Sequence, residues 1–174
     1  LALARLVSYI GPTAGALVTT SDKKHPKPIA FIQCVCSRDV RVNSNCSAFC
    51  CTASVKQAIL ATEHIPDVDC TVFYMDLRAF GKGYDEFYTR ARNMDIDFIA
   101  GVPSEIHQNP DGTLTFDVYD KSTNKLLQIN ADMVVLGTGL VPNNDLAKIS
   151  ALFHASRSQD GFLLEAHPKL KPLE

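Results

Sequence analysis

Four of the six cysteines have the spacing C-x11-C-x3-C-C, and they are Cys34, Cys46, Cys50 and Cys51. They follow an apolar, strand-like run at residues 28–33 and lead into a segment with helical periodicity. Each iron of an iron–sulfur cluster requires an outer sulfur ligand, so four thiolates at one strand-to-helix turn are a suitable ligand set. The spacing therefore predicts an iron–sulfur site at this turn.

Other uses of these thiols stay open. A four-thiolate zinc site takes the same ligands, although zinc sites usually have two separated C-x2-4-C pairs and the adjacent Cys50 and Cys51 fit tetrahedral zinc poorly. A thiol–disulfide enzyme would have C-x-x-C spacing, which neither this pair nor Cys34 with Cys36 has. A disulfide scaffold would have small, strained loops, because five of the six cysteines lie within 18 residues. Cys70 opens an apolar strand, and we expect it to be a buried hydrophobic residue.

The apolar residues alternate between strand-like runs and helical periods. Helices are expected over 1–10, 47–65 and 84–91, and buried parallel strands over 29–35, 70–75, 97–100 and 133–136. Three further strands, expected over 102–106, 114–119 and 126–129, are separated by turn residues as in antiparallel hairpins. This order predicts an α/β fold: a Rossmann-like FAD/NAD(P)-binding-type three-layer domain with an antiparallel hairpin insert.

In such sheets the functional crevice lies at the carboxyl ends of the strands, beside the first strand-to-helix turn. A dinucleotide-binding domain has G-x-G-x-x-G at this turn, so that the backbone can approach a pyrophosphate. This chain has side chains at residues 34–39 instead, so a plain NAD-binding domain is not expected. The following helix is expected to begin near Cys50 and Cys51, where the helix dipole would stabilise thiolates and an anionic cluster.

A chain of 174 residues with 46% hydrophobic residues and a net charge of −2 has the composition of one soluble domain with extensions. We divide it into an N-terminal flank and linker at 1–28, a Rossmann-like cluster-bearing domain at 29–142 and a C-terminal flank at 143–174. The near-neutral charge argues against nucleic acid as a partner, and no apolar run reaches the roughly 18 residues of a membrane span. Clustered cysteines in such a domain indicate metal or redox chemistry in the cytoplasm.

Several longer motifs resemble one protein family. They are Ile29–Asp39, Cys46–Cys51 and Lys56–Ile59, together with Phe73–Tyr84, Ala131–Leu136 and the leading Gly11-Pro12-Thr13-x-Gly15. These runs resemble the A subunit of CoB–CoM heterodisulfide reductase and its bacterial homologues, and the resemblance covers nearly the whole chain. Those proteins are longer: they carry a flavin domain like that of thioredoxin reductase, ferredoxin-type cluster segments and an inserted dinucleotide-like domain that holds one [4Fe–4S] cluster. This chain resembles the inserted domain, with its C-terminal flank leading toward the flavin domain.

The resemblance implies that Cys34, Cys46, Cys50 and Cys51 are the ligands of a [4Fe–4S] cluster. It also implies that Lys56 approaches the ring of FAD in the parent protein, where a cation would favour the reduced, anionic flavin. From its spacing alone, Lys56 would be a solvated helix lysine. The family usually has glycine at the position of Cys36, and this chain therefore has a bulkier, oxidisable group there.

The implied function is electron transfer between FAD and other clusters through one [4Fe–4S] cluster. The chain would then be a fragment of an oxidoreductase that does not turn over alone. Its expected partners are the other domains of the parent flavoprotein and other heterodisulfide-reductase-type subunits. The alternative hypothesis is a degenerate nucleotide-type binding or docking module without a cluster, and iron and sulfide content would distinguish the two.

Overall fold

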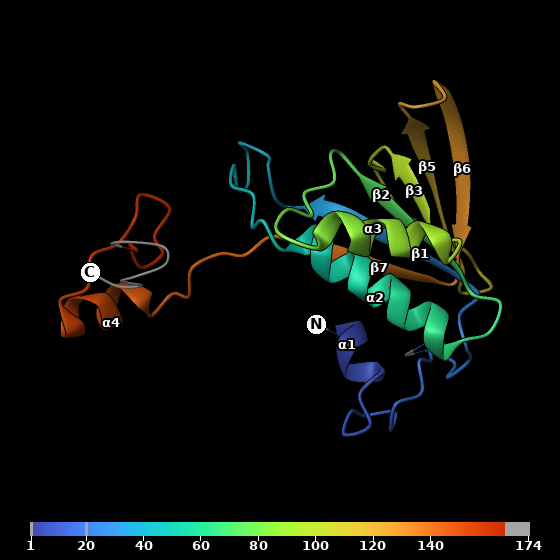
Figure 1. Cartoon of the computed structure of the whole chain (residues 1–174), viewed down its shortest axis with the longest axis horizontal. Coiled ribbons are helices and arrows are strands. Elements are labelled where there is room, and N and C mark those ends of the chain that lie inside the picture. The colour runs from blue at the N-terminus through green and yellow to red at the C-terminus, as the bar shows by residue number, and fades with distance from the viewer. Residues whose placement is uncertain (1, 20, 166–174) are drawn as a thin grey trace.

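The structure, a computed structural model, describes residues 2–19 and 21–165. A parallel sheet forms its centre (Figure 1), with the strand order β3-β2-β1-β7. The strands are β1 (Pro28–Val35), β2 (Asp69–Tyr74), β3 (Asp97–Ala100) and β7 (Met133–Thr138). The apolar run that predicts the first strand is β1, which pairs in parallel with β2 on one side and β7 on the other. Residues 29–33 of β1 are buried, because other layers cover both faces of a parallel sheet, and this explains why the sequence of the strand is largely apolar.

Two helices, α2 (Cys50–His64) and α3 (Tyr84–Asn93), cover one face of the parallel sheet. Phe31 of β1 and Val72 of β2 pack there against Val55 and Ala58 of α2, all of them buried. The short α1 (Ala2–Leu6) contributes Leu3 to the same core. These contacts fix the first turn of α2 above the carboxyl ends of the central strands.

A second, antiparallel sheet covers the opposite face, with the order β4-β5-β6. Its strands are β4 (His107–Gln108), β5 (Leu114–Asp120) and β6 (Lys125–Ala131). Phe116 of β5 meets Phe73 of β2 edge to face, with ring centroids 5.3 Å apart. The expected three-layer α/β fold with a hairpin insert is therefore confirmed.

Two expected elements differ from the structure. The strand expected over 102–106 is a loop, and pairing begins only at His107. Pro103 lies within this stretch and has no backbone N–H to donate to a ladder. The helix expected over 1–10 ends at Leu6, since Tyr9 and Ile10 are exposed and have no core to pack against.

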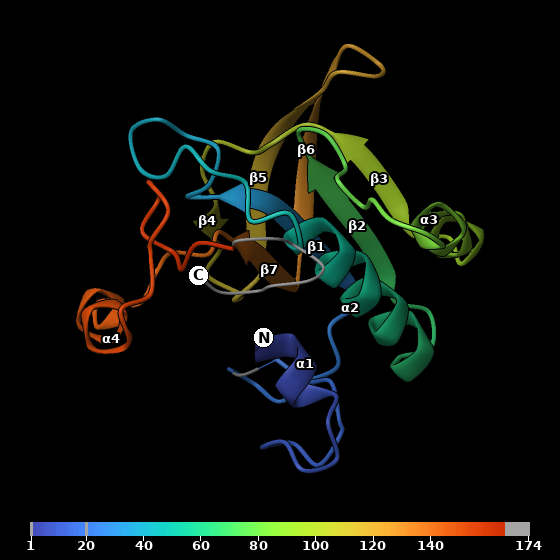
Figure 2. The same cartoon turned by 60° about the vertical axis from the view of Figure 1, so that its left-hand side comes forward.

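The chain after β7 continues to α4 (Leu146–Phe153), which stands apart from the sheets in both views (Figure 2). Leu152 and Phe153 are each 73% exposed. The three-part division of the chain stays a prediction, and the last nine residues of the expected C-terminal flank lie outside the described residues. Within residues 2–19 and 21–165, no helix has both the length and the apolar composition that crossing a bilayer requires.

The direction of chain progression reverses between β1 and β7. The chain passes from β1 to β2 and β3 in one direction across the sheet, and β7 then lies on the other side of β1. Open α/β sheets bind their ligands at such a reversal, outside the carboxyl ends of the strands. The ends of β1 and β7, at Val35 and Thr138, therefore mark the place to look for a site.

Candidate functional site

Cys34 lies at the carboxyl end of β1 in an unusual backbone conformation. Its φ is +59°, in the left-handed region, and the register between β1 and β7 shifts between Ile32 and Val35. Such a bulge changes the direction in which a side chain leaves its strand. The regular alternation of β1 therefore ends before Cys34.

Cys46 and Cys50 come from the loop after β1 and from the start of α2. The backbone N–H of Ala48 donates a hydrogen bond to Sγ of Cys46 at 3.4 Å. The thiol of Cys50, the first residue of α2, donates to the carbonyl oxygen of Thr138 at 3.6 Å. The first turn of α2 therefore lies directly beside the end of β7, the strand at which the order of the sheet reverses.

The loop that carries Cys46 is anchored to the segment after β7. The backbone N–H of Leu140 donates to Oγ of Ser47 at 2.6 Å, and Nδ2 of Asn43 donates to the carbonyl of Leu140 at 3.3 Å. Gly139 lies close to Ser37, so that a Cβ there would be 2.9 Å from the serine Cβ. The loop, β7 and α2 are thereby held together on one side of the sheet edge.

Cys51 is the buried member of the group, with 6% of its surface exposed. Burial raises the pKa of its thiol, the charges of Cys34, Cys46 and Cys50 raise it further, and a hydrogen bond from the backbone N–H of Arg78 opposes the rise. Cys34 and Cys46 lie at the end of β1 and in the following loop, and Cys50 and Cys51 open α2, so all four lie toward the same edge of the sheet. Their role as ligands stays a prediction.

Cationic groups flank these thiols. Burial raises the pKa of Cys34, while a hydrogen bond and the positive charge of Arg38 oppose the rise. The Arg38 guanidinium, 23% exposed, also pairs with Asp76. Asp76 accepts a second bond, at 2.8 Å, from Nε of Arg78, and these two arginines lower its pKa. Asp76 thus holds both arginines beside the thiols.

The donor set fits an anionic, thiolate-bound group. The cysteines, a backbone N–H that donates to Sγ of Cys46 and the guanidinium of Arg38 beside Cys34 form an environment that stabilises negative charge on sulfur. All six cysteines are free thiols. Across the described residues, no three side chains of His, Cys, Asp or Glu converge closely enough to hold one metal ion.

The two remaining cysteines differ from this group. Cys36 is exposed and lies beyond the end of β1 at Val35, so it does not share a strand face with Cys34. Cys70 is only 2% exposed, and burial raises the pKa of its thiol to about 11. The prediction that Cys70 is a buried core residue is confirmed.

Lys56 does not join the thiols. It is exposed on α2 and follows Cys51 by five residues. At a rise of 1.5 Å per residue, the two residues are about 7.5 Å apart along the helix axis. It lines a groove of about 500 Å³ between α2 and α3, together with Lys82 and the apolar side chain of Phe87. This groove presents positive charge beside an apolar floor.

A second hollow, of about 890 Å³, opens beside the thiols at the carboxyl ends of the strands. Cys34, Arg38 and Leu136 line it, together with Val102 from the loop after β3. It occupies the position of the crevice that the fold predicts, and its wall includes one of the four thiols.

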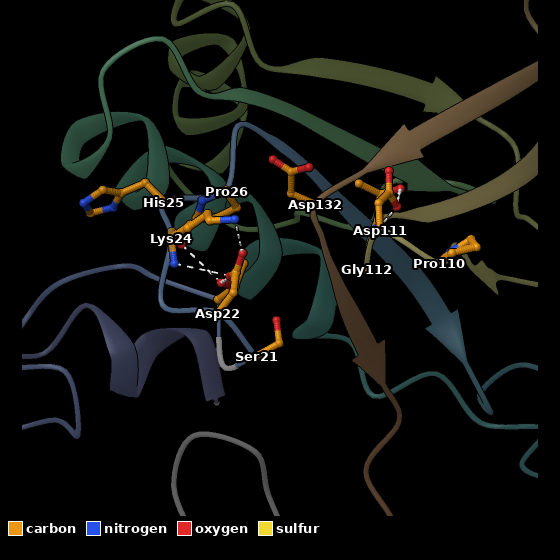
Figure 3. A pocket seen from close by; sticks show the side chains of 11 residues that line it. Ser21, Asp22, Lys24, His25, Pro26, Pro110, Asp111, Gly112 and Asp132 are labelled. Carbon is orange, nitrogen blue, oxygen red and sulfur yellow. Dashed lines mark hydrogen bonds and ion pairs between the residues drawn. The ribbon is translucent and has the colours of Figure 1, made fainter.

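A third pocket lies at the opposite end of the sheet and has a different character (Figure 3). It measures about 400 Å³, and its carboxylates come from Asp22, Asp111 and Asp132. Each of them accepts a hydrogen bond from a nearby backbone N–H. Asp22 and Asp111 therefore stabilise local turns, and Asp132 ties the chain before β7 to Lys27 before β1, remote from the thiols.

Sequence reasoning missed Asp76 and the contact with Thr138. Asp76 follows the end of β2, at the same sheet edge as Cys34, and this placement is the signal that could have identified it. Thr138 acts through its carbonyl oxygen, which any residue supplies, so no sequence signal marks it.

Comparisons with known proteins give relatives that match the whole length of the chain. No protein-family model matches the chain. The chain is 46% identical over 176 residues to the A subunit of the H2:CoB–CoM heterodisulfide,ferredoxin reductase of Methanothermobacter thermautotrophicus, and the match covers 100% of the chain and 27% of that protein. It is 45% identical to the second iron-sulfur A subunit of the CoB–CoM heterodisulfide reductase of Methanopyrus kandleri, over 99% of the chain and 27% of the relative.

Among solved structures, thioredoxin reductase of T. acidophilum superposes with a TM-score of 0.51 at 16% identity, over 84% of the chain and 40% of that protein. This likeness supports the FAD/NAD(P)-binding type of fold and nothing beyond the fold. The chain spans about a quarter of the length of the curated relatives that it matches. Since that match runs through the whole chain at 45–46% identity, the chain belongs to the family of heterodisulfide reductase A subunits.

Proposed function

We propose that Cys34, Cys46, Cys50 and Cys51 hold one [4Fe–4S] cluster and that the chain is an electron-transfer segment. The observation that supports the proposal is the placement of Cys34 at the end of β1 and of Cys50 and Cys51 in the first turn of α2, at the reversal point of the sheet. A [4Fe–4S] cluster takes one outer thiolate on each iron, so its ligands need not converge on a single point. When bound, the cluster supplies one-electron redox chemistry.

The chain's own residues set the environment of this site. Arg38 and the N–H groups of Ala48 and Arg78 place positive charge and hydrogen-bond donors against the sulfurs. Such donors favour the more negative, reduced state and so raise the reduction potential of a cluster. The burial of Cys51 by the sheet excludes water from one side.

We propose FAD as the electron-exchange partner, held by another segment of the parent polypeptide. Lys56, exposed in the groove between α2 and α3, is the residue that would approach the flavin ring. Bound flavin supplies two-electron chemistry, and a cation beside the ring favours its anionic, reduced form. Other subunits of a heterodisulfide-reductase-type complex are the further partners that the relatives' names support.

The test is anaerobic reconstitution of the chain with iron and sulfide, followed by metal analysis and EPR of the reduced sample. Uptake of about four irons and four sulfides per chain, with a reduced-cluster EPR signal, is the expected result. Uptake of one zinc instead would assign a structural metal site. Uptake of neither would favour the docking module without a cluster.

A further inference from the structure

Gln33 is a polar residue in the middle of the core. It precedes Cys34 in β1, and its side chain is 0% exposed. Neither its Oε1 nor its Nε2 has a hydrogen-bond partner among the described residues. Buried carboxamides are almost always hydrogen-bonded, because an unpaired buried amide costs free energy. Gln33 therefore requires a partner that residues 2–19 and 21–165 do not supply.

The register of β1 places this side chain beneath α2. Side chains alternate along a strand, so Gln33 shares a face with Ile29 and Phe31, which pack in the core under α2. The neighbouring strand β7 has glycine beside it: a Cβ at Gly137 would lie 2.8 Å from Oε1 of Gln33. The absence of a side chain at Gly137 leaves the room that the carboxamide occupies.

Two consecutive residues of β7, Gly137 and Thr138, connect Gln33 to the thiols. Gln33 lies against Gly137, and the next residue, Thr138, accepts the hydrogen bond from the thiol of Cys50. Cys51 follows on α2 and is buried. The carboxamide thus lies on the helix-covered face of the sheet, one residue along β7 from the strand end that contacts the first turn of α2.

We propose that Gln33 is a positioning residue whose carboxamide N–H donates a hydrogen bond to an inorganic sulfide of the bound cluster, on the side of Cys50 and Cys51. The inference deepens the function proposed above and rests on it. A donor at this position stabilises extra negative charge on sulfur, so it raises the reduction potential of the bound cluster. The amide then gains the partner that it lacks among the described residues.

The test compares Gln33→Leu with Gln128→Leu in the full chain. The second variant makes the same substitution at an exposed position on β6, in the other sheet. After reconstitution, the midpoint potential is measured by redox titration with EPR detection. We expect a shift to more negative potential for Gln33→Leu and no shift for Gln128→Leu. Gln33→Met, of similar length and also without a donor, provides the same measurement if the leucine variant does not fold.

A second readout, thermal unfolding of the cluster-free chain, separates this role from a purely structural one. Without a cluster, the Gln33 amide is an unpaired buried group, so Gln33→Leu should raise the melting temperature. A lower melting temperature together with an unchanged potential would make Gln33 a structural residue and overturn the inference. If the wild-type chain takes up no cluster, the proposed function fails and the inference fails with it. If the cluster binds and only the potential shift is missing, the inference alone fails.

Discussion

The thiol of Cys50 lies 3.6 Å from the carbonyl oxygen of Thr138, a residue 88 positions later in the sequence. This contact joins the first turn of α2 to the end of β7, the strand that reverses the order of the sheet. It places a helix start, and with it two adjacent thiols, at the edge where open α/β sheets bind ligands. In this chain the backbone and thiol groups occupy the position at which a glycine-rich turn would cradle a phosphate.

The first prediction concerns the ligand role of Cys50, with Cys36 as its control. Cys50→Ser should abolish most of the cluster uptake, because one of the four outer ligands is lost. Cys36→Ser is the matched control, since Cys36 is exposed and lies beyond the end of β1. Iron and sulfide analysis of both variants, with EPR of the reduced samples, measures the difference. Uptake by Cys50→Ser equal to that of the wild-type chain would remove Cys50 from the ligand set.

The second prediction concerns the guanidinium at Cys34. Arg38→Met removes a cation that hydrogen-bonds this thiol, so the reduced cluster should be less stable. We expect the midpoint potential to fall by about 40 mV, which corresponds to about 1 kcal/mol for a one-electron couple. Arg41→Met is the control, because Arg41 pairs with Asp39 and is largely exposed in the same loop. An equal fall in both variants would indicate a general effect of loop charge.

Much of the fold follows from apolar periodicity. The apolar run at 29–35 predicts a buried strand, and the period over 47–65 predicts the helix that follows it; β1 and α2 occupy these positions. Both signals are strong because each element is buried along its length or along one face. The two-residue β4, His107–Gln108, has no such signal, since both of its residues are exposed and polar.

The candidate site was less predictable, because its contacts depend on tertiary structure. The spacing of Cys34, Cys46, Cys50 and Cys51 identifies the thiols, while nothing in the sequence shows that Cys34 adopts a positive φ. A non-glycine residue takes this conformation only when its surroundings enforce it. Gln33 did carry a signal, because it is a polar residue on the core-facing side of an otherwise apolar strand.

The third prediction concerns Lys56 in a polypeptide that contains this chain and its flavin segment. Lys56→Met should lower the two-electron potential of the flavin by about 20–40 mV, since this corresponds to losing about 1–2 kcal/mol of charge stabilisation. Lys125→Met, on β6 of the other sheet, is the control for a change in total charge. Spectroscopic titration of the flavin measures both variants. An unchanged potential for Lys56→Met would leave Lys56 as a solvated helix lysine.

The fourth prediction concerns the contact between the two sheets. Phe116→Ala removes the ring that packs edge to face on Phe73 and leaves a cavity in the inter-sheet core. The free energy of unfolding should fall by about 3–5 kcal/mol. Leu126→Ala, at a largely exposed position in the same hairpin, should change it by less than about 0.5 kcal/mol. Urea denaturation measures both, and similar losses would show that the hairpin does not pack as described.

The last prediction concerns Cys70, whose pKa burial raises to about 11 from an ordinary value of 9.0. The thiolate is the nucleophile, so iodoacetamide at pH 8 should spare Cys70 in the folded, cluster-free chain while it modifies the exposed Cys36. The raised pKa also makes stability depend on pH, because the thiol of Cys70 ionises at lower pH in the unfolded chain than in the folded one. The stability contributed by the neutral thiol is therefore complete below about pH 9 and is lost as the pH rises toward 11. Mass spectrometry of the labelled peptides checks the difference in modification between Cys70 and Cys36. Thermal unfolding between pH 8 and pH 11 checks the pH dependence of stability. In Cys70→Ala, the part of the fall in stability that comes from ionisation of Cys70 should disappear. Modification of Cys70 at the rate of Cys36 would contradict its burial beneath α2.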